Sequence, residues 1–198
     1  GRLIDYLDET GQLNNTMIIL TSDNGASMEG GMNGSFSEYL MLNLMPAENV
    51  SFLKSKIDEL GGPMAFGHYP EGWAMAGNTP FKLYKQWTNE GGVHDPLVIY
   101  YPNNITDQGG VRTQFTHAID IVPTILEVVG IEAPEMYKGI PQKPIEGVSM
   151  AYTFEEPEAE NRKSVQYFSM WGSRGLWYDN WKAVTMHPHE SGGNFDQD

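Results

Sequence analysis

The feature that most constrains the fold is the stretch TMIILTSDNGA, residues 16–26, in which an apolar run stops abruptly at polar residues. Uninterrupted apolar runs are typical of strands in a parallel sheet that is covered on both faces. The stretch DPLVIYYP, residues 95–102, predicts a second strand of this kind. The sequence therefore predicts an α/β fold, in which helices cover a mostly parallel sheet.

Helical patterns flank the two predicted strands. Apolar residues recur at helical spacing over residues 2–9 and predict a helix before the first strand. The stretch THAIDIVPTILEVVGI, residues 116–131, predicts another helix, with Pro123 in its first turn and Gly130 at its C-terminal cap. A third helix is expected near residues 51–60, inside a long irregular insertion between the strands.

The C-terminal part of the chain has a different pattern. In RGLWYDNWKAVTM, the pair Asp179 and Asn180 separates two strand-like runs, which is the composition of a tight hairpin. A small antiparallel sheet is therefore expected there, after a Pro, Gly and Glu-rich surface connection over residues 132–160. We expect residues 1–150 to belong to the α/β domain, and residues 151–198 to form an antiparallel subdomain and tail.

Composition and charge narrow the classes of partner. The chain has 198 residues, 26 of them Asp or Glu and 12 Lys or Arg, so its net charge is −14. This charge repels nucleic acid and anionic membrane surfaces, and we expect no nucleic-acid partner. Cysteine is absent, which excludes disulfides and thiolate chemistry within this chain. No apolar run has the length of a membrane span, and we expect none.

Asp23 and Asn24, which follow the first strand, are candidate metal ligands. In open α/β sheets, ligand sites lie beyond the carboxyl ends of the strands. A carboxylate and a carboxamide provide hard oxygen donors, which suit Ca²⁺ or Mg²⁺. The alternative is a plain turn, because Asn-Gly is a common turn dipeptide.

A second group of candidate residues lies in GNTPFKLYKQWTNEGGVHDP, residues 77–96. Here Lys82 and Lys85 precede a Glu-Gly-Gly turn that leads directly into the second strand, so this loop should open on the same sheet edge as Asp23. A lysine there is a compact positive charge for an anionic substrate group. The alternative is that both lysines are solvated surface residues.

Four stretches, in this order and spacing, resemble the C-terminal half of a type I sulfatase of the bacterial arylsulfatase branch: TMIILTSDNGA, TPFKLYKQWTNEGGVHDPLVIYYP, THAIDIVPTILEVVGI and RGLWYDNWKAVT. The resemblance implies an alkaline phosphatase-like fold, with a mixed, mostly parallel sheet flanked by helices and a small C-terminal antiparallel sheet. It implies a sulfuric ester hydrolase that acts on a small-molecule or glycan sulfate ester. Family habit points to the periplasm or secretion, and the oligomeric state stays open.

The resemblance also implies roles for individual residues. Asp23 and Asn24 fall on the family's Ca²⁺ ligands, with Mg²⁺ as the alternative ion, and Asp23 would also help to activate the catalytic nucleophile. The family lysine that lies five residues before the Glu-Gly-Gly turn contacts the sulfate, and this spacing selects Lys85 as a catalytic and substrate-binding residue, with Lys82 as a bystander. His68, in the long insertion, is a candidate for substrate contact, and an incidental loop histidine is the alternative.

The nucleophile of the family is expected outside this chain. Sulfatases use a formylglycine made from Cys or Ser in a C/S-x-P-x-R motif, and no residue of this chain lies in such a motif. We therefore expect a fragment that is inactive alone and is completed by an N-terminal half that carries the formylglycine. The alternatives are a phosphonate monoester or phosphodiester hydrolase of the same superfamily, or a non-catalytic binding module.

Overall fold

The computed structural model describes residues 1–43 and 48–187. The chain divides into two compact units: the first combines Gly1–Leu20 with Val98–Gln166, and the second combines Thr21–Leu97 with Tyr167–Asp198. The end of the predicted C-terminal tail, residues 188–198, lies outside the described residues. Within the described ranges, every helix is too short or too polar to cross a membrane.

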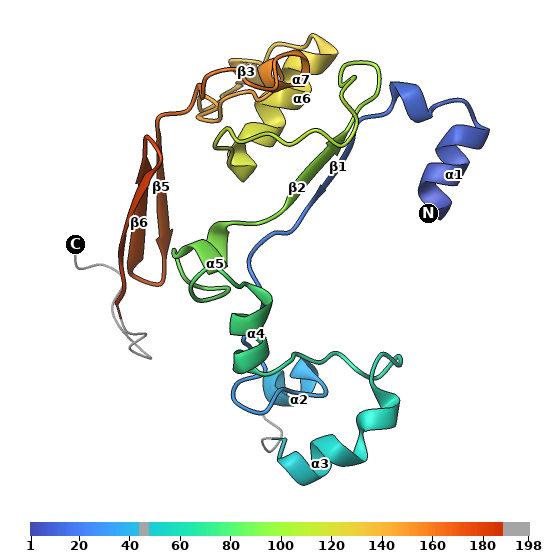
Figure 1. The fold of residues 1–198 in the computed structure, drawn as a ribbon, viewed down its shortest axis with the longest axis vertical. Helices are drawn as coiled ribbons and strands as arrows, with labels where there is room; N and C mark the ends of the chain where they lie inside the picture. The colour runs from blue at the N-terminus through green and yellow to red at the C-terminus, as the bar shows by residue number, and fades with distance from the viewer. Residues whose placement is uncertain (44–47, 188–198) are drawn as a thin grey trace. The chain divides into compact units, whose positions relative to one another are not determined.

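The predicted strands β1 (Ile18–Thr21) and β2 (Leu97–Tyr100) pair as a two-stranded sheet (Figure 1). Their side chains are not covered on both faces by the described residues, because Leu20 is 69% exposed and Val98 is 56% exposed. Exposed apolar side chains in neighbouring strands form a surface that is favourable to bury. The strands lie where the sequence predicts them, but the expected cover is not supplied by the described part of the chain.

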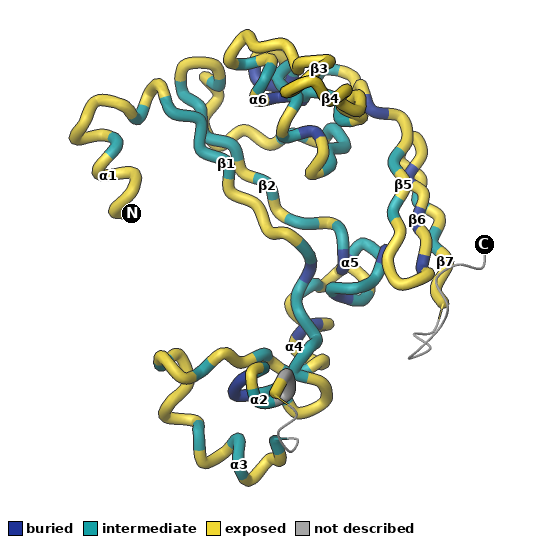
Figure 2. The backbone as a smooth tube through the Cα atoms, turned by 180° about the vertical axis from the view of Figure 1, so that it is seen from behind, coloured by how far each residue is buried: buried dark blue, intermediate teal, exposed yellow. Residues whose placement is uncertain are grey.

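The predicted helices of the first unit are confirmed. Helix α1 (Arg2–Glu9) precedes the short 3-10 helix η1 (Leu13–Asn15), and none of its residues is buried (Figure 2). Helix α6 (Ile121–Val129) has Pro123 in its first turn and ends at Gly130, whose φ of 67° is left-handed as predicted.

A buried acid anchors the start of α6. Asp120, at the end of the 3-10 helix η3 (Ala118–Asp120), is only 2% exposed. Its carboxylate accepts hydrogen bonds from the backbone N–H groups of His117 and Val148, both at 2.8 Å, and forms an ion pair with Lys163 Nζ at 2.6 Å. These contacts fix α6 to two segments that are distant in sequence.

The connection predicted over residues 132–160 contains more structure than expected. It includes an antiparallel pair of two-residue strands, β3 (Met136–Tyr137) and β4 (Ile140–Pro141), and the one-turn helix α7 (Tyr152–Glu155). Elements this short contain too few residues to show a period of their own. They could not be predicted from the apolar pattern.

The second unit contains most of the long insertion. The helix expected near residues 51–60 is present as α3 (Val50–Ser55), whose first turn is capped by Asn49, followed by η2 (Ile57–Glu59). The insertion also contains α2 (Glu38–Leu42) and α4 (Glu71–Gly77). Helix α4 corrects the expectation that the insertion is irregular outside residues 51–60, because frequent Gly and Pro hide the helical pattern there.

The C-terminal sheet is confirmed, with strand order β5 (Val165–Met170), β6 (Ser173–Tyr178) and β7 (Trp181–Thr185). Strands β6 and β7 pair antiparallel, with Tyr178 opposite Trp181. The two turn residues between them, Asp179 and Asn180, have φ values of 43° and 69°. Positive φ at both central residues is the conformation that matches the twist of a two-residue hairpin, as the sequence predicts.

Candidate functional site

The site lies where the chain leaves β1 and where it enters β2. The Gly25 N–H donates a hydrogen bond to Gly92 O at 3.2 Å, which joins the loop after β1 to the one-turn helix α5 (Glu90–Val93). The Lys85 N–H donates to Ala26 O at 3.0 Å. The two loops that were predicted to open on one edge of the sheet therefore touch through their backbones.

The glycines at this junction are required by close backbone packing. A Cβ atom on Gly25 would lie 1.7 Å from Gly91 O, and a Cβ atom on Gly91 would lie 2.0 Å from Leu83 O. Gly25 does not have a positive φ, so the left-handed conformation that favours glycine in tight turns does not explain it. Gly25 of the Asn-Gly pair is therefore required by the close contact between the two loops.

Replacing Gly91 with alanine is expected to destabilise this junction. The new Cβ would collide with backbone carbonyls, and such overpacking costs about 1–3 kcal/mol. The free energy of unfolding of the full-length protein, measured with urea, should fall by this amount. The control is Gly72→Ala in α4, where no atom lies within 4 Å of the new Cβ, so stability should be unchanged or slightly raised. Equal stabilities of the two variants would contradict the packing argument.

Asn78 is a positioning residue that the sequence analysis missed. Its Nδ2 donates to Leu83 O at 3.0 Å and to Gly91 O at 2.8 Å, and its Oδ1 accepts from Ala26 N at 3.2 Å. One amide side chain therefore ties together the loop after β1, the lysine loop and the start of α5. The sequence signal is weak, because the role depends on contacts with residues far away in the chain.

Asp23 and Asn24 present oxygen atoms at the end of β1. Asp23 is exposed, and its carboxylate has no hydrogen bond or ion pair within residues 1–43 and 48–187. The Asn24 Nδ2 donates to Gly25 O at 2.9 Å, which leaves the carbonyl Oδ1 available as a ligand. Asp95 lies nearby, just before β2: burial raises the pKa of its carboxyl, and the negative charge of Asp23 raises this pKa further.

These donors fit a hard divalent cation in type but not in number. Carboxylate and amide oxygens are the ligands that Ca²⁺ prefers, and mutual repulsion of Asp23 and Asp95 favours a cation beside them. A Ca²⁺ ion takes about six to eight oxygen ligands. In the part of the chain that the structure describes, no group of three or more His, Asp or Glu residues could hold a metal. Further ligands would have to come from elsewhere.

Lys85 is held by an acid that the sequence analysis did not select. Its Nζ lies 3.0 Å from both carboxylate oxygens of Glu29, and the hydrogen bond from this ammonium group lowers the pKa of Glu29. The Lys85 side chain is 29% exposed, so its ammonium can still be reached by a ligand. Lys82, in contrast, is exposed and has no side-chain ion pair among the described residues.

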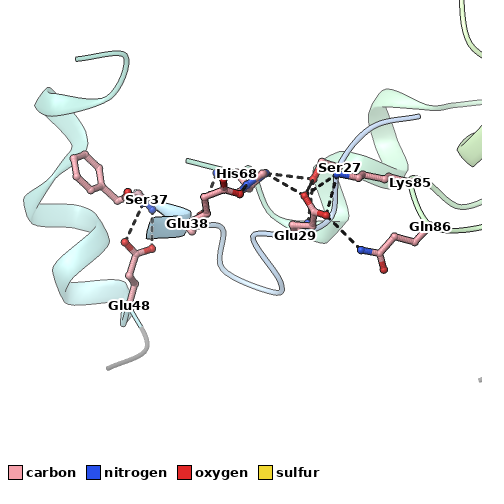
Figure 3. Close-up of polar contacts among 10 residues, drawn as sticks. Ser27, Glu29, Ser37, Glu38, Glu48, His68, Lys85 and Gln86 are labelled. Atoms are coloured by element: carbon pink, nitrogen blue, oxygen red, sulfur yellow. Dashed lines mark hydrogen bonds and ion pairs between the residues drawn. The ribbon is translucent and has the colours of Figure 1, made fainter. Parts of the chain in front are cut away.

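His68 belongs to the same network. Its Nε2 lies 2.8 Å from Glu38 Oε2, and its Nδ1 lies 3.3 Å from Ser27 Oγ and 3.9 Å from Glu29 Oε2. Figure 3 shows these side chains in a row that ends at Lys85. The structure thus brings together two of the predicted site residues, His68 and Lys85, through Ser27 and Glu29.

Glu90 of the Glu-Gly-Gly motif has a structural role. It accepts hydrogen bonds from Lys182 Nζ of β7 at 2.5 Å and from His94 Nδ1 at 2.7 Å. Burial acts to raise the pKa of Glu90, but the hydrogen bonds from Lys182 and His94 lower it overall. The His94 ring also stacks on Phe81 at 4.3 Å. Glu90 therefore ties α5 to the C-terminal sheet.

Comparisons with known proteins point to one family. A family model described as Sulfatase matches residues 1–131. An uncharacterised sulfatase of Schizosaccharomyces pombe is 36% identical over 135 residues, which are 68% of this chain and 23% of that protein. The arylsulfatase of Klebsiella aerogenes is 28% identical over 153 residues, which are 76% of this chain and 31% of that protein.

A solved structure shows the fold. A protein in complex with its substrate D-glucosamine-2-N,6-O-disulfate superposes with a TM-score of 0.57, covering 93% of this chain and 28% of that one at 20% identity. This likeness confirms the predicted α/β fold class. The present chain spans less than a third of the length of each of these relatives.

Proposed function

Because this chain belongs to the sulfatase family, we propose that it forms one side of the active site of an arylsulfatase-type sulfuric ester hydrolase. The observation that carries the proposal is the backbone contact between the loop after β1 and the loop of Lys85. This contact between the two motifs of the resemblance supports the proposal that they form one site. The nucleophile, expected to be a formylglycine, would have to come from residues outside this chain, so the chain is expected to be inactive alone.

In this proposal the residues of the chain have separate roles. Asp23 and Asn24 hold the metal, Ca²⁺ or alternatively Mg²⁺, which when bound supplies positive charge beside the sulfate oxygens. Lys85 places its ammonium against the same sulfate group and stabilises the negative charge that develops as the S–O bond breaks. His68, oriented by Glu38 at 2.8 Å, contacts the substrate.

The substrate class in this proposal is a sulfate ester of a small molecule or a glycan. The relatives support it by their names: one is an arylsulfatase, and another, from Bacteroides thetaiotaomicron, is an N-acetylglucosamine-6-O-sulfatase that is 26% identical over 145 residues. An aryl sulfate is therefore a suitable first probe. A higher kcat/KM for an aryl phosphonate monoester would favour the phosphonate hydrolase alternative instead.

Lys85→Gln in the full-length protein tests the proposal. Loss of a charge that stabilises the transition state should lower kcat/KM for 4-nitrophenyl sulfate by about 10² to 10³-fold. The matched control is Lys82→Gln, which removes the same charge from an exposed side chain three residues away and should change kcat/KM less than about twofold. An equal, small effect of both substitutions would overturn the role given to Lys85.

A further inference from the structure

We propose that Glu29 selects substrates by charge, favouring singly charged sulfate esters over doubly charged phosphate monoesters. The inference rests on the proposed function, since it requires Lys85 to contact the anionic group of the substrate. An anion that reaches the ammonium of Lys85 must also approach the Glu29 carboxylate, because Lys85 Nζ lies 3.0 Å from both of its oxygens. Part of the attraction that Lys85 offers is therefore cancelled by a fixed negative charge.

The Glu29 carboxylate is held so that it cannot easily turn away. Its Oε2 accepts a hydrogen bond from Ser27 Oγ at 3.0 Å, and its Oε1 accepts one from Gln86 Nε2 at 3.4 Å (Figure 3). Both donors are neutral, so they orient the carboxylate without removing its charge. The hydrogen bond from Lys85 also lowers the pKa of Glu29, which keeps it ionised at neutral and alkaline pH. An anion bound at Lys85 is therefore repelled by the negative charge of Glu29.

Charge repulsion distinguishes the two classes of substrate. A sulfate ester carries one negative charge, whereas a phosphate monoester carries close to two at a pH of about 8. Repulsion scales with the charge of the substrate, so a carboxylate a few ångströms away penalises the phosphate monoester more. At a separation of about 6 Å and an effective dielectric of about 40, between the values for a protein surface and for bulk water, one additional charge changes binding by on the order of tenfold. A phosphonate monoester carries a single charge and should be treated like a sulfate.

A purely positioning role of Glu29 predicts a different result. If the carboxylate only held Lys85 in place, its loss would lower kcat/KM for all anionic substrates by the same factor. Selection by charge would instead change the ratio of the kcat/KM values for substrates of different charge. The ratio is therefore the quantity to measure.

The test is Glu29→Gln in the full-length protein, assayed at a pH of about 8 with 4-nitrophenyl sulfate, 4-nitrophenyl phosphate and 4-nitrophenyl phenylphosphonate. The ratio of kcat/KM for the phosphate to that for the sulfate should rise by about tenfold, while the phosphonate-to-sulfate ratio stays the same. An unchanged phosphate-to-sulfate ratio would overturn the inference, and so would an equal rise for the phosphonate.

Glu38→Gln is the matched control. It removes the same charge from the other end of the network, where Glu38 contacts His68 at 2.8 Å and has no hydrogen bond to Lys85 among the described residues. The phosphate-to-sulfate ratio should change less than about twofold, because the charge lies farther from the ammonium. A rise as large as that of Glu29→Gln would show that the general negative field selects the substrate, against the assignment to Glu29.

The variant of Lys85 separates failure of this inference from failure of the proposed function. If Lys85→Gln keeps full turnover of 4-nitrophenyl sulfate, the proposed function fails, and the role of Glu29 fails with it. If Lys85→Gln loses turnover while Glu29→Gln leaves the phosphate-to-sulfate ratio unchanged, only the inference about Glu29 fails.

Discussion

Replacing Asp23 with alanine in the full-length protein is expected to abolish metal-dependent turnover of 4-nitrophenyl sulfate, with a loss on the order of 10³-fold or more. In the proposed site, Asp23 would supply the charged oxygen ligand at the end of β1, and the neutral Asn24 beside it could not replace that charge. The measurement is kcat/KM as a function of added Ca²⁺ after chelation, together with calorimetric titration of Ca²⁺ into the protein. Binding and turnover should both be lost.

The same substitution should leave the fold intact. The Asp23 side chain is exposed and makes no hydrogen bond or ion pair within the described ranges, so its removal breaks no contact there. The urea midpoint should therefore be unchanged, within about 0.5 kcal/mol in the free energy of unfolding. Asp58→Ala is the charge-matched control, since Asp58 is an exposed acid of η2 in the same unit. Turnover in Asp23→Ala with unaltered Ca²⁺ dependence would refute the assignment.

The sequence was sufficient where a local rule decides the structure. Gly130 ends α6 because a left-handed residue terminates a helix, and Asp179 with Asn180 forms the hairpin because both tolerate positive φ. The apolar runs also predicted β1 and β2, because an uninterrupted apolar run is itself a local pattern. Each of these features depends on residues that are adjacent in the chain.

The sequence was insufficient where distant segments decide the structure. Asn78 bonds to Ala26, 52 residues earlier, and Glu29 pairs with Lys85, 56 residues later. Glu29 lies in a Gly, Met and Ser-rich stretch without a period, so nothing in its neighbourhood marks it. The order of the motifs predicted that Lys85 and the loop of Asp23 lie on one edge of the sheet. It did not predict the ion pair between Glu29 and Lys85, because this pair forms only when the two loops fold against each other.

Replacing Asp120 with alanine should cause the largest loss of stability, about 3–5 kcal/mol. The substitution leaves the ammonium of Lys163, whose side chain is only 6% exposed, buried without its ion-pair partner at 2.6 Å. It also leaves the backbone N–H groups of His117 and Val148 without the acceptor that they share. The free energy of unfolding of the full-length protein, from urea denaturation, measures the loss.

Two further variants show how much of this loss of stability comes from the buried ammonium of Lys163 and how much from the unpaired backbone N–H groups. Lys163→Met should cost less than Asp120→Ala, because the carboxylate keeps both of its backbone donors. The double variant Asp120→Ala with Lys163→Met should recover part of the loss, since no unpaired charge remains buried, but not all of it, since two N–H groups still lack an acceptor. If the double variant were as unstable as Asp120→Ala alone, the buried ammonium would not be the main cause. Full recovery would instead show that the N–H groups contribute nothing.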